Sequence, residues 1–505
     1  MRAWCLALAL FIALPVQAGD WLRARTPNFV VESDTSAAVL RRHAQQLEAF
    51  RTAALWVLGK DGAERTQRPP TQLMLLKQRE SLNEVRPGTP RNAWGYMSQC
   101  EDGAVAFAAV PPETRSVAQD WGTFVVFHEY AHRLMFQVGQ RYYPAWFVEG
   151  FADFMAGTEI EPGRVTFGQA VPWRTGMLAD GGWLDAATLL AAGPEIYARH
   201  ERTVGLFYAQ AWLLTHFMLN DTALARRFYD YFEKVGAGAD PVQAFEPAVG
   251  IAVPAVNQRL RQHLATLQAT RVSGRDLLQA DPVIEPVPGP DGQVLLAAAV
   301  LKTCPPRAQG EQMLVRLRAL EGEPASQGQG VKLARARAEL AFGDPAAARD
   351  ALQALVAQAD DLAEAHQLLA RALVAAAPKD DAEARDAARQ EARTHAFRAY
   401  RLQRQDAPTL YRLAQILQAD GATTNLRNAA RGAQALEPLV PSYAVLAAQV
   451  ALDAGQRDEA IAALAPLATY PHNPQQVARL RRAIEALRQG ASRAEFDRLL
   501  DSKEE

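Results

Sequence analysis

Residues 128–132 have the types and spacing with the clearest chemical meaning in this chain. They read His-Glu-Tyr-Ala-His, an H-E-x-x-H pattern, within a proline-free run from 116 to 137 that predicts a helix. Residues four apart on a helix share one face, so His128 and His132 can direct two imidazole nitrogens at one Zn²⁺ ion. Glu129 lies about 100° round the helix, where it can reach a water on the metal. An amphipathic helix with two partly buried histidines is the alternative.

A second predicted helix, residues 145–156, follows Pro144, a residue that suits the first helical turn. It reads AWFVEGFADFMA, which puts Glu149 and Asp153 four positions apart on one face among aromatic side chains. A carboxylate is costly to bury there unless it is paired or binds a metal ion. These two carboxylates are therefore candidates for a metal site, with a solvated stripe on the helix as the alternative.

Strand-like segments precede these helices, and helical segments follow them. The predicted strands of a mixed sheet lie at residues 28–32, 71–76, 93–99 and 104–110. Residues 203–219 are apolar nearly all round, as expected of a buried helix. Residues 19–270 are therefore predicted to form one α+β domain, a mixed sheet followed by a helical half.

The composition of the chain narrows its class. A length of 505 residues exceeds one ordinary core and predicts two or three domains. Hydrophobic residues make up 49% and charged residues 22%, as in globular proteins, and the formal net charge is −2. Without a basic excess, nucleic acid is not an expected partner.

The first residues have the organisation of a signal peptide, predicted at 1–18. Arg2 precedes an apolar stretch, and Val-Gln-Ala forms a small-residue cleavage site before Gly19. The stretch is short for a membrane span, and an uncleaved anchor is the alternative. We therefore expect a periplasmic or secreted protein with no membrane span after signal removal.

Two cysteines remain after Cys5 leaves with the signal peptide, namely Cys100 and Cys304. An oxidising compartment permits a disulfide between them, but sequence spacing does not define one. Two free or buried thiols are the preferred interpretation.

The second half of the chain has a different composition. Residues 271–330 are rich in proline, glycine and glutamine and predict a stiff linker, whereas residues 331–491 have helical spacing throughout. Gly421 and Gly455 each precede a helical segment and stand 34 residues apart, the tetratricopeptide (TPR) period. The region resembles a degenerate TPR array that could bind substrate or a protein partner, with a simple helical bundle as the alternative. Residues 492–505 predict a polar, frayed tail.

The two helices with histidines and carboxylates together resemble the gluzincin metallopeptidases, the thermolysin-like and aminopeptidase N-like group also called peptidase MA-like. In that group H-E-x-x-H is followed, on the next helix, by a ligand Glu, which the aminopeptidase-like branch places in a W-x-x-E-G-x-A context. This chain reads WFVEGFA at residues 146–152. The resemblance covers about residues 19–270 and implies a zincin domain that hydrolyses peptide bonds with Zn²⁺.

The resemblance also implies a role for each side chain. His128, His132 and Glu149 would ligate zinc and leave the fourth position open for water. Glu129 would accept a proton from that water and deliver it to the leaving amine, while Asp153 would hold the second nitrogen of a ligand histidine.

An oxyanion donor is expected as well, since the aminopeptidase-like branch uses a tyrosine about sixty residues after the ligand Glu. Tyr208, 59 residues after Glu149, is the predicted catalytic donor, and a core tyrosine is the alternative. His200 and His216 are further candidates that suit structural roles better.

Substrate in this group binds along an edge strand just before the metal helix, and the predicted strand at 104–110 occupies that place. The aminopeptidase branch has a G-x-M-E-N motif there, whereas residues 95–98, Gly-Tyr-Met-Ser, lack its Glu. An endopeptidase is therefore slightly favoured over an aminopeptidase. A non-hydrolytic TPR scaffold with a degenerate peptidase domain is the alternative function, and a non-peptide zinc hydrolase would share the same site.

Overall fold

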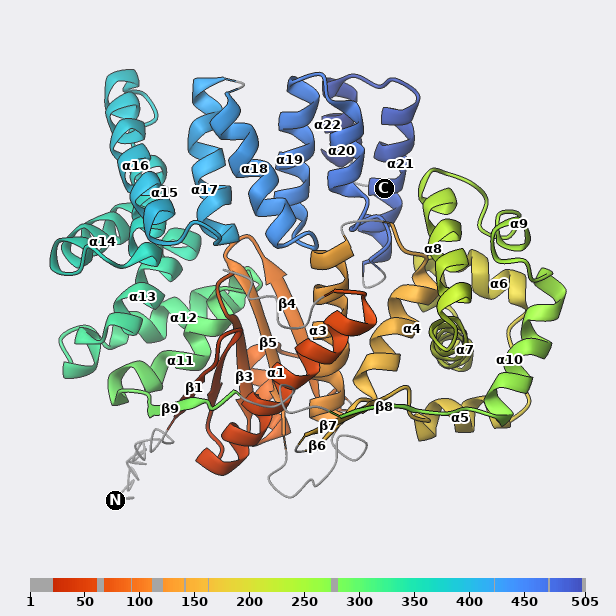
Figure 1. Cartoon of the computed structure of the whole chain (residues 1–505). Helices are drawn as coiled ribbons and strands as arrows, with labels where there is room; N and C mark the ends of the chain where they lie inside the picture. The colour runs from red at the N-terminus through yellow and green to blue at the C-terminus, as the bar shows by residue number, and fades with distance from the viewer. Residues whose placement is uncertain are drawn as a thin grey trace, which may run out of the picture.

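The computed structural model describes residues 21–60, 68–91, 93–110, 121–139, 142–161, 163–273, 280–421, 423–470 and 473–501. The predicted signal peptide at 1–18 lies outside the described residues, as do positions 116–120 of the predicted metal helix. The described chain is mostly helical, with a mixed sheet near its N-terminal end (Figure 1).

A six-stranded mixed sheet has the strand order β4-β5-β3-β2-β1-β9. Strands β2, β3 and β5 are parallel, and the remaining pairs are antiparallel. The bounds are β1 Leu22–Arg25, β2 Phe29–Ser33, β3 Thr71–Leu76, β4 Gly95–Cys100, β5 Gly103–Ala109 and β9 Val283–Pro286. The prediction that residues 104–110 form the edge is wrong, because a tight turn at Glu101 and Asp102 folds β4 over β5 and makes β4 the edge strand.

Both faces of the sheet are buried. Alternate side chains of a strand point to opposite sides, so each strand contributes to two separate cores. Leu73 and Leu75 of β3 belong to the apolar core that includes α1 (Ala37–Val57). Met74 and Leu76 belong to a second core on the other face, which includes side chains of α11 (Gly289–Leu301). The short helix α2 (Leu82–Val85) joins this second core.

The helical half follows the sheet. Its elements are α3 Trp121–Gly139, α4 Ala145–Ala156, α5 Pro172–Ala179, α6 Ala186–Ala191, η3 Pro194–Ala198, α7 Glu201–Leu219, α8 Thr222–Gly236, α9 Phe245–Val249 and α10 Val256–Ala265. A three-stranded antiparallel sheet accompanies them, with β6 Glu159–Glu161, β7 Arg164–Phe167 and β8 Thr270–Ser273. Helix α4 packs between α3 and α7, and this three-helix layer contains the candidate site.

The region predicted as a linker, residues 271–330, is largely ordered structure in its described part. β9 pairs with β1, and helices α11 (Gly289–Leu301) and α12 (Arg307–Ala319) follow it. A disulfide joins Cys100 at the end of β4 to Cys304 between these helices, with Cα atoms 6.0 Å apart. The preference for two free thiols is therefore wrong.

The C-terminal region is a stack of antiparallel helix pairs (Figure 1). Its helices are α13 Gln329–Phe342, α14 Pro345–Gln358, α15 Ala363–Ala376, α16 Ala382–Leu402, α17 Ala407–Leu417, α18 Thr424–Leu436, α19 Pro441–Asp453, α20 Arg457–Leu464, α21 Pro474–Arg488 and α22 Arg493–Asp501. Gly421 and Gly455 have positive φ angles in the turns before α18 and α20, a conformation that favours glycine. The arrangement is TPR-like. Residues 493–501 are helical and Phe496 is fully buried, which corrects the prediction of a frayed tail.

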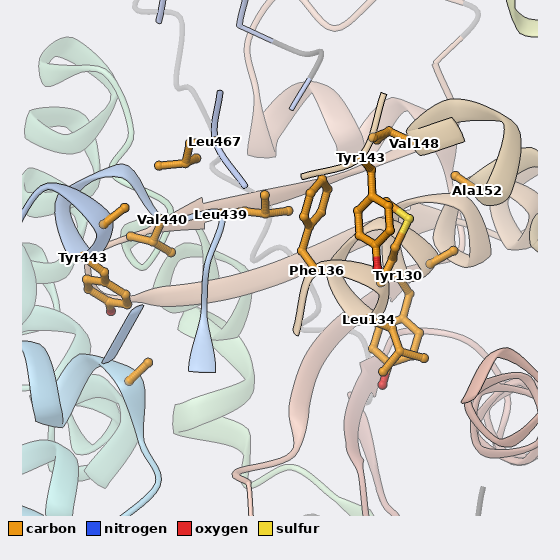
Figure 2. Close-up of a cluster of buried hydrophobic side chains, with 14 of the residues drawn as sticks. Tyr130, Leu134, Phe136, Tyr143, Val148, Ala152, Leu439, Val440, Tyr443 and Leu467 are labelled. Atoms are coloured by element: carbon orange, nitrogen blue, oxygen red, sulfur yellow. The ribbon is translucent and has the colours of Figure 1, made fainter. Parts of the chain in front are cut away.

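The repeat helices share one apolar core with the helical half. Figure 2 shows Phe136 of α3 beside Leu439, which lies between α18 and α19, and the same cluster includes Val440 and Tyr443. Because these side chains are buried together, the repeats are packed against helix α3 rather than joined to it by a loose connection.

Candidate metal centre

Helix α3 contains both histidines of the H-E-x-x-H pattern. Most residues of α3 are apolar and buried, so the rest of the protein covers the helix on nearly all sides. The imidazoles of His128 and His132 are buried as well. The Nε2 atoms of His128 and His132 lie 3.1 Å apart, as expected for two side chains one helical turn apart that point to one spot.

Helix α4 brings Glu149 to the same spot. It begins after Pro144, whose carbonyl accepts hydrogen bonds from the Phe147 and Val148 amides, and all of its residues are buried. Gly150 faces α7, where a Cβ atom would overlap the Ala211 carbonyl and the Thr215 hydroxyl. The missing side chain thus lets α4 and α7 approach closely and fixes the depth of the fully buried Glu149.

Three donor atoms form a nearly equilateral triangle. Glu149 Oε2 lies 3.2 Å from His128 Nε2 and 3.5 Å from His132 Nε2, and the third edge is the 3.1 Å between the histidines. A tetrahedral zinc ion with bonds of about 2.0–2.1 Å separates neighbouring ligand atoms by about 3.3 Å. The donor set therefore fits zinc in both chemistry and spacing. Within the described ranges no other trio of metal-ligating side chains converges in this way.

Asp153 lies behind His128, one turn after Glu149 on α4. Its Oδ1 is 3.0 Å from His128 Nδ1, and its Oδ2 accepts a 2.6 Å hydrogen bond from Arg174 Nε on α5. A proton on Nδ1 leaves the Nε2 lone pair directed at the other two donors, which is the tautomer a metal requires. The sequence prediction left open which histidine Asp153 would hold, and the structure puts it on His128.

The protonation of His128 is the main variable in the charge balance of the metal-free site. Burial by itself lowers the pKa of His128, but hydrogen bonds and charges from Asp153 and Glu149 outweigh it and raise the pKa to about 10. Burial also lowers the pKa of His132, and there it dominates. Burial raises the pKa of Asp153, but Arg174 and His128 hold it below its ordinary value. Without a metal, a protonated His128 and Arg174 together compensate the two buried carboxylates, Glu149 and Asp153.

Glu129 is half-buried on α3 beside the triangle. Its carboxylate is close enough to act electrostatically on His132, Tyr208 and Tyr470. It is thus near the three donor residues without belonging to the triangle, as its predicted role as a proton acceptor requires.

Tyr208 of α7 is half-buried next to His128, with ring centroids 6.4 Å apart. The Arg174 guanidinium lies 4.6 Å over its ring, so one arginine contacts both Asp153 and the predicted oxyanion donor. Burial and the charge of Glu149 raise the pKa of Tyr208 well above its ordinary value, which keeps the phenol protonated and able to donate.

Three residues at the site were missed by sequence reasoning. Tyr197 of η3 donates a 3.0 Å hydrogen bond to Glu149 Oε1, and the ring of Tyr470 lies 6.1 Å from that of His132. Arg174 is the third. A buried carboxylate at Asp153 predicts some cationic partner, which could have pointed to an arginine, but no spacing rule identifies either tyrosine.

The two alternative histidine donors lie in other surroundings. His200 caps the start of α7, where its Nδ1 accepts from the Arg202 amide at 3.2 Å. His216 pairs with His263 at 2.7 Å and with the Gly168 carbonyl at 2.9 Å. These three contacts support the structural roles that the sequence favoured for the two histidines.

Comparison with protein-family models gives no match, and neither does comparison with curated proteins. Among solved structures, the chain is similar to a thermophilic TPR protein from Thermus thermophilus, with 22% identity over 39% of this chain and 99% of that one, and a TM-score of 0.34. In the described part of the chain, none of the helices combines the length and apolar character needed to cross a bilayer.

Proposed function

We propose that this protein is an exported zinc-dependent peptidase, with a gluzincin-like domain at residues 19–270 and a TPR-like array behind it. The donor triangle of His128, His132 and Glu149 is the observation that supports this proposal most strongly. Three buried ligands from two helices, with a carboxylate behind one histidine, have the composition of a catalytic His₂Glu zinc site rather than a closed structural site.

Bound zinc would supply a Lewis acid and lower the pKa of a water molecule towards neutrality. Glu129 then accepts a proton from the attacking water and passes it to the leaving amine. Asp153 keeps His128 in the ligating tautomer, and Arg174 holds Asp153 ionised. Tyr208 donates a hydrogen bond to the carbonyl oxygen where negative charge develops.

A peptide is the substrate class that the surroundings support. β4 is an edge strand beside α3, and among the described strands none pairs with its outer side, where a peptide could add as a further strand. The strand lacks a glutamate of the kind that aminopeptidases use to hold a free amine, since Gly95 to Ser98 contain none. We therefore favour cleavage within an unfolded polypeptide over removal of a terminal residue.

Metal analysis tests the ligand set. Wild-type protein should bind one zinc ion per chain, and His128→Ala and Glu149→Ala should both lose it. Glu246→Gln, on the exposed surface of α9, is the matched control and should retain zinc. Retention of zinc in Glu149→Ala would remove Glu149 from the ligand set.

Hydrolysis of casein, with and without a chelator, tests the reaction. Glu129→Gln should keep zinc and lose activity by a factor of about 100 or more, because it removes the proton acceptor and leaves the ligands intact. Stoichiometric zinc with no difference between wild type and Glu129→Gln would favour a non-hydrolytic scaffold. Zinc-dependent turnover of a non-peptide ester alone would identify a different hydrolase.

A further inference from the structure

The turn between β4 and β5 is bound by side chains from successive helices of the repeat array. Asp102, between β4 and β5, pairs with Arg337 of α13 at 2.8 Å, Arg412 of α17 at 3.0 Å and Arg371 of α15 at 3.3 Å. Asp102 and Arg337 are almost completely buried, so these are desolvated contacts rather than surface ion pairs.

The next helix of the same series contacts the neighbouring residue. Tyr443 of α19 donates a 2.8 Å hydrogen bond to the carbonyl of Glu101, and Arg412 pairs with the Glu101 carboxylate at 2.7 Å. The first helix of each of four consecutive pairs thus supplies one side chain to a single turn. This face of the array is occupied by the chain itself.

The repeats also hold the metal helix directly. Arg133, the residue after His132, makes a bidentate ion pair with Glu437 at the end of α18, and both side chains are buried. One turn further on, Gln137 donates a 2.8 Å hydrogen bond to the Leu436 carbonyl. The array is therefore fixed relative to the two histidines.

This attachment brings a repeat residue to the metal ligands. Tyr470 follows α20, and its ring lies edge-on to His132 at 6.1 Å and to Phe136 at 6.5 Å. Burial, followed by the negative charges of Glu129 and Glu149, raises the pKa of the Tyr470 hydroxyl well above its ordinary value, so the hydroxyl stays protonated. Tyr470 thus lies on the His132 side of the site, whereas Tyr208 lies on the His128 side.

A second contact supports the site from the same region. Helix α21 packs on η3, the turn that contains Tyr197, and Arg481 of α21 lies against Gly193 just before it. Arg481 also donates a 3.0 Å hydrogen bond to the Ala468 carbonyl, two residues before Tyr470. One arginine therefore links the segment of Tyr470 to the turn that binds Glu149.

We propose that the C-terminal repeats complete the metal site, with Tyr470 as a wall that closes it beside His132 and as a hydroxyl donor to the bound peptide. The part played by the substrate rests on the proposed function, whereas closure of the site does not. The array accordingly positions and encloses substrate, and the face that holds Asp102 is not a docking surface for another protein.

The test uses the full-length protein loaded with zinc and distinguishes the contribution of the Tyr470 ring from that of its hydroxyl. Tyr470→Ala should release zinc to excess EDTA about tenfold faster than wild type, because the site loses its cover, while Tyr470→Phe should release zinc at the wild-type rate. Tyr470→Phe should raise the KM for a casein-derived peptide about tenfold with kcat little changed, because one hydrogen bond to bound substrate is lost. Tyr400→Ala and Tyr400→Phe, in α16, which packs on α15 and α17 and lies away from α3 in Figure 1, are matched controls.

Thermal melting establishes that each variant is folded, and Tyr470→Leu replaces Tyr470→Ala if the latter is not. If Tyr470→Ala or Tyr470→Leu releases zinc at the wild-type rate, the Tyr470 ring does not close the site. If the KM of Tyr470→Phe is unchanged, the Tyr470 hydroxyl does not contact the substrate. If wild type hydrolyses no peptide, the proposed function fails, yet the zinc-release rates still decide whether Tyr470 closes the site.

Discussion

Asp153 is the residue on which the charges of the site converge. It is fully buried between His128 and Arg174, so its negative charge is compensated on two sides. A carboxylate in this position orients the imidazole and increases its basicity as a ligand. The donor triangle therefore depends on a side chain that does not itself belong to it.

Replacing Asp153 by Asn should weaken zinc binding by a factor of about 10 to 100, because the histidine loses its charged partner. Competition against a chromophoric chelator measures the affinity. Asp230→Asn, on the exposed surface of α8, should leave it unchanged. Equal affinities in the two variants would contradict the role of Asp153.

Zinc affinity should also depend on pH. The pKa of His128 in the metal-free protein is raised to about 10, so below that pH its proton must leave before zinc binds. Release of one proton makes the affinity rise about tenfold per pH unit between about pH 6 and 9. Titrations corrected for protonation of the chelator test this slope, and a pH-independent affinity would contradict it.

At the scale of elements, close packing of α3, α4 and α7 positions the donors. Gly150 is the residue that permits it, since any side chain would meet the backbone of α7. Gly176 on α5 is an exposed helical glycine with open space around it, and so provides a matched comparison.

Gly150→Ala should destabilise the protein by about 1–3 kcal/mol through overpacking. Gly176→Ala should be neutral or stabilising by up to about 1 kcal/mol, because alanine loses less backbone entropy in a helix. Chemical denaturation gives both free energies of unfolding. A Gly150→Ala protein as stable as wild type would show that α4 and α7 do not need this close approach.

Sequence patterns predicted the helices of the site but not the strand and helix in the proline-rich region, for a physical reason. The prolines between 282 and 290 suggested a linker, yet Pro286 ends the edge strand β9, and Pro288 and Pro290 stand at the start of α11. Proline is tolerated at sheet edges and first helical turns, because no backbone hydrogen bond is lost there. Composition alone therefore did not distinguish a stiff linker from a strand and helices that pack on the rest of the chain.

At the scale of the whole molecule, the two halves are joined by buried charge and by a common core. Burial raises the pKa of Asp102, but Arg337, Arg412 and Arg371 outweigh it and hold the pKa well below its usual range. Burial likewise opposes ionisation of Glu364, but Lys302 and Arg337 lower its pKa to about 2. The junction therefore requires ionised carboxylates.

Asp102→Asn should cost about 3–5 kcal/mol of stability at neutral pH, because it leaves the arginines buried without their shared partner. The folded pKa of Asp102 lies below the unfolded value of about 3.9, so its stabilisation is fully present above about pH 5 and is lost as the pH falls. Denaturation from pH 3 to 7 should show less acid sensitivity in Asp102→Asn than in wild type, with Glu364 responsible for part of the remainder. Asp230→Asn is the control, and a variant as acid-sensitive as wild type would contradict this role of Asp102.

The sequence by itself determined the local part of the site. A spacing of four residues puts His128 with His132 and Glu149 with Asp153 on one helical face each, and the resemblance to the gluzincins implied that the two pairs form one site. Tertiary structure alone decided the rest, including the disulfide, the grip on Asp102 and the approach of Tyr470 to His132. Those partners are separated by 200 residues or more along the chain. Their meeting depends on how whole layers pack, which no local periodicity encodes.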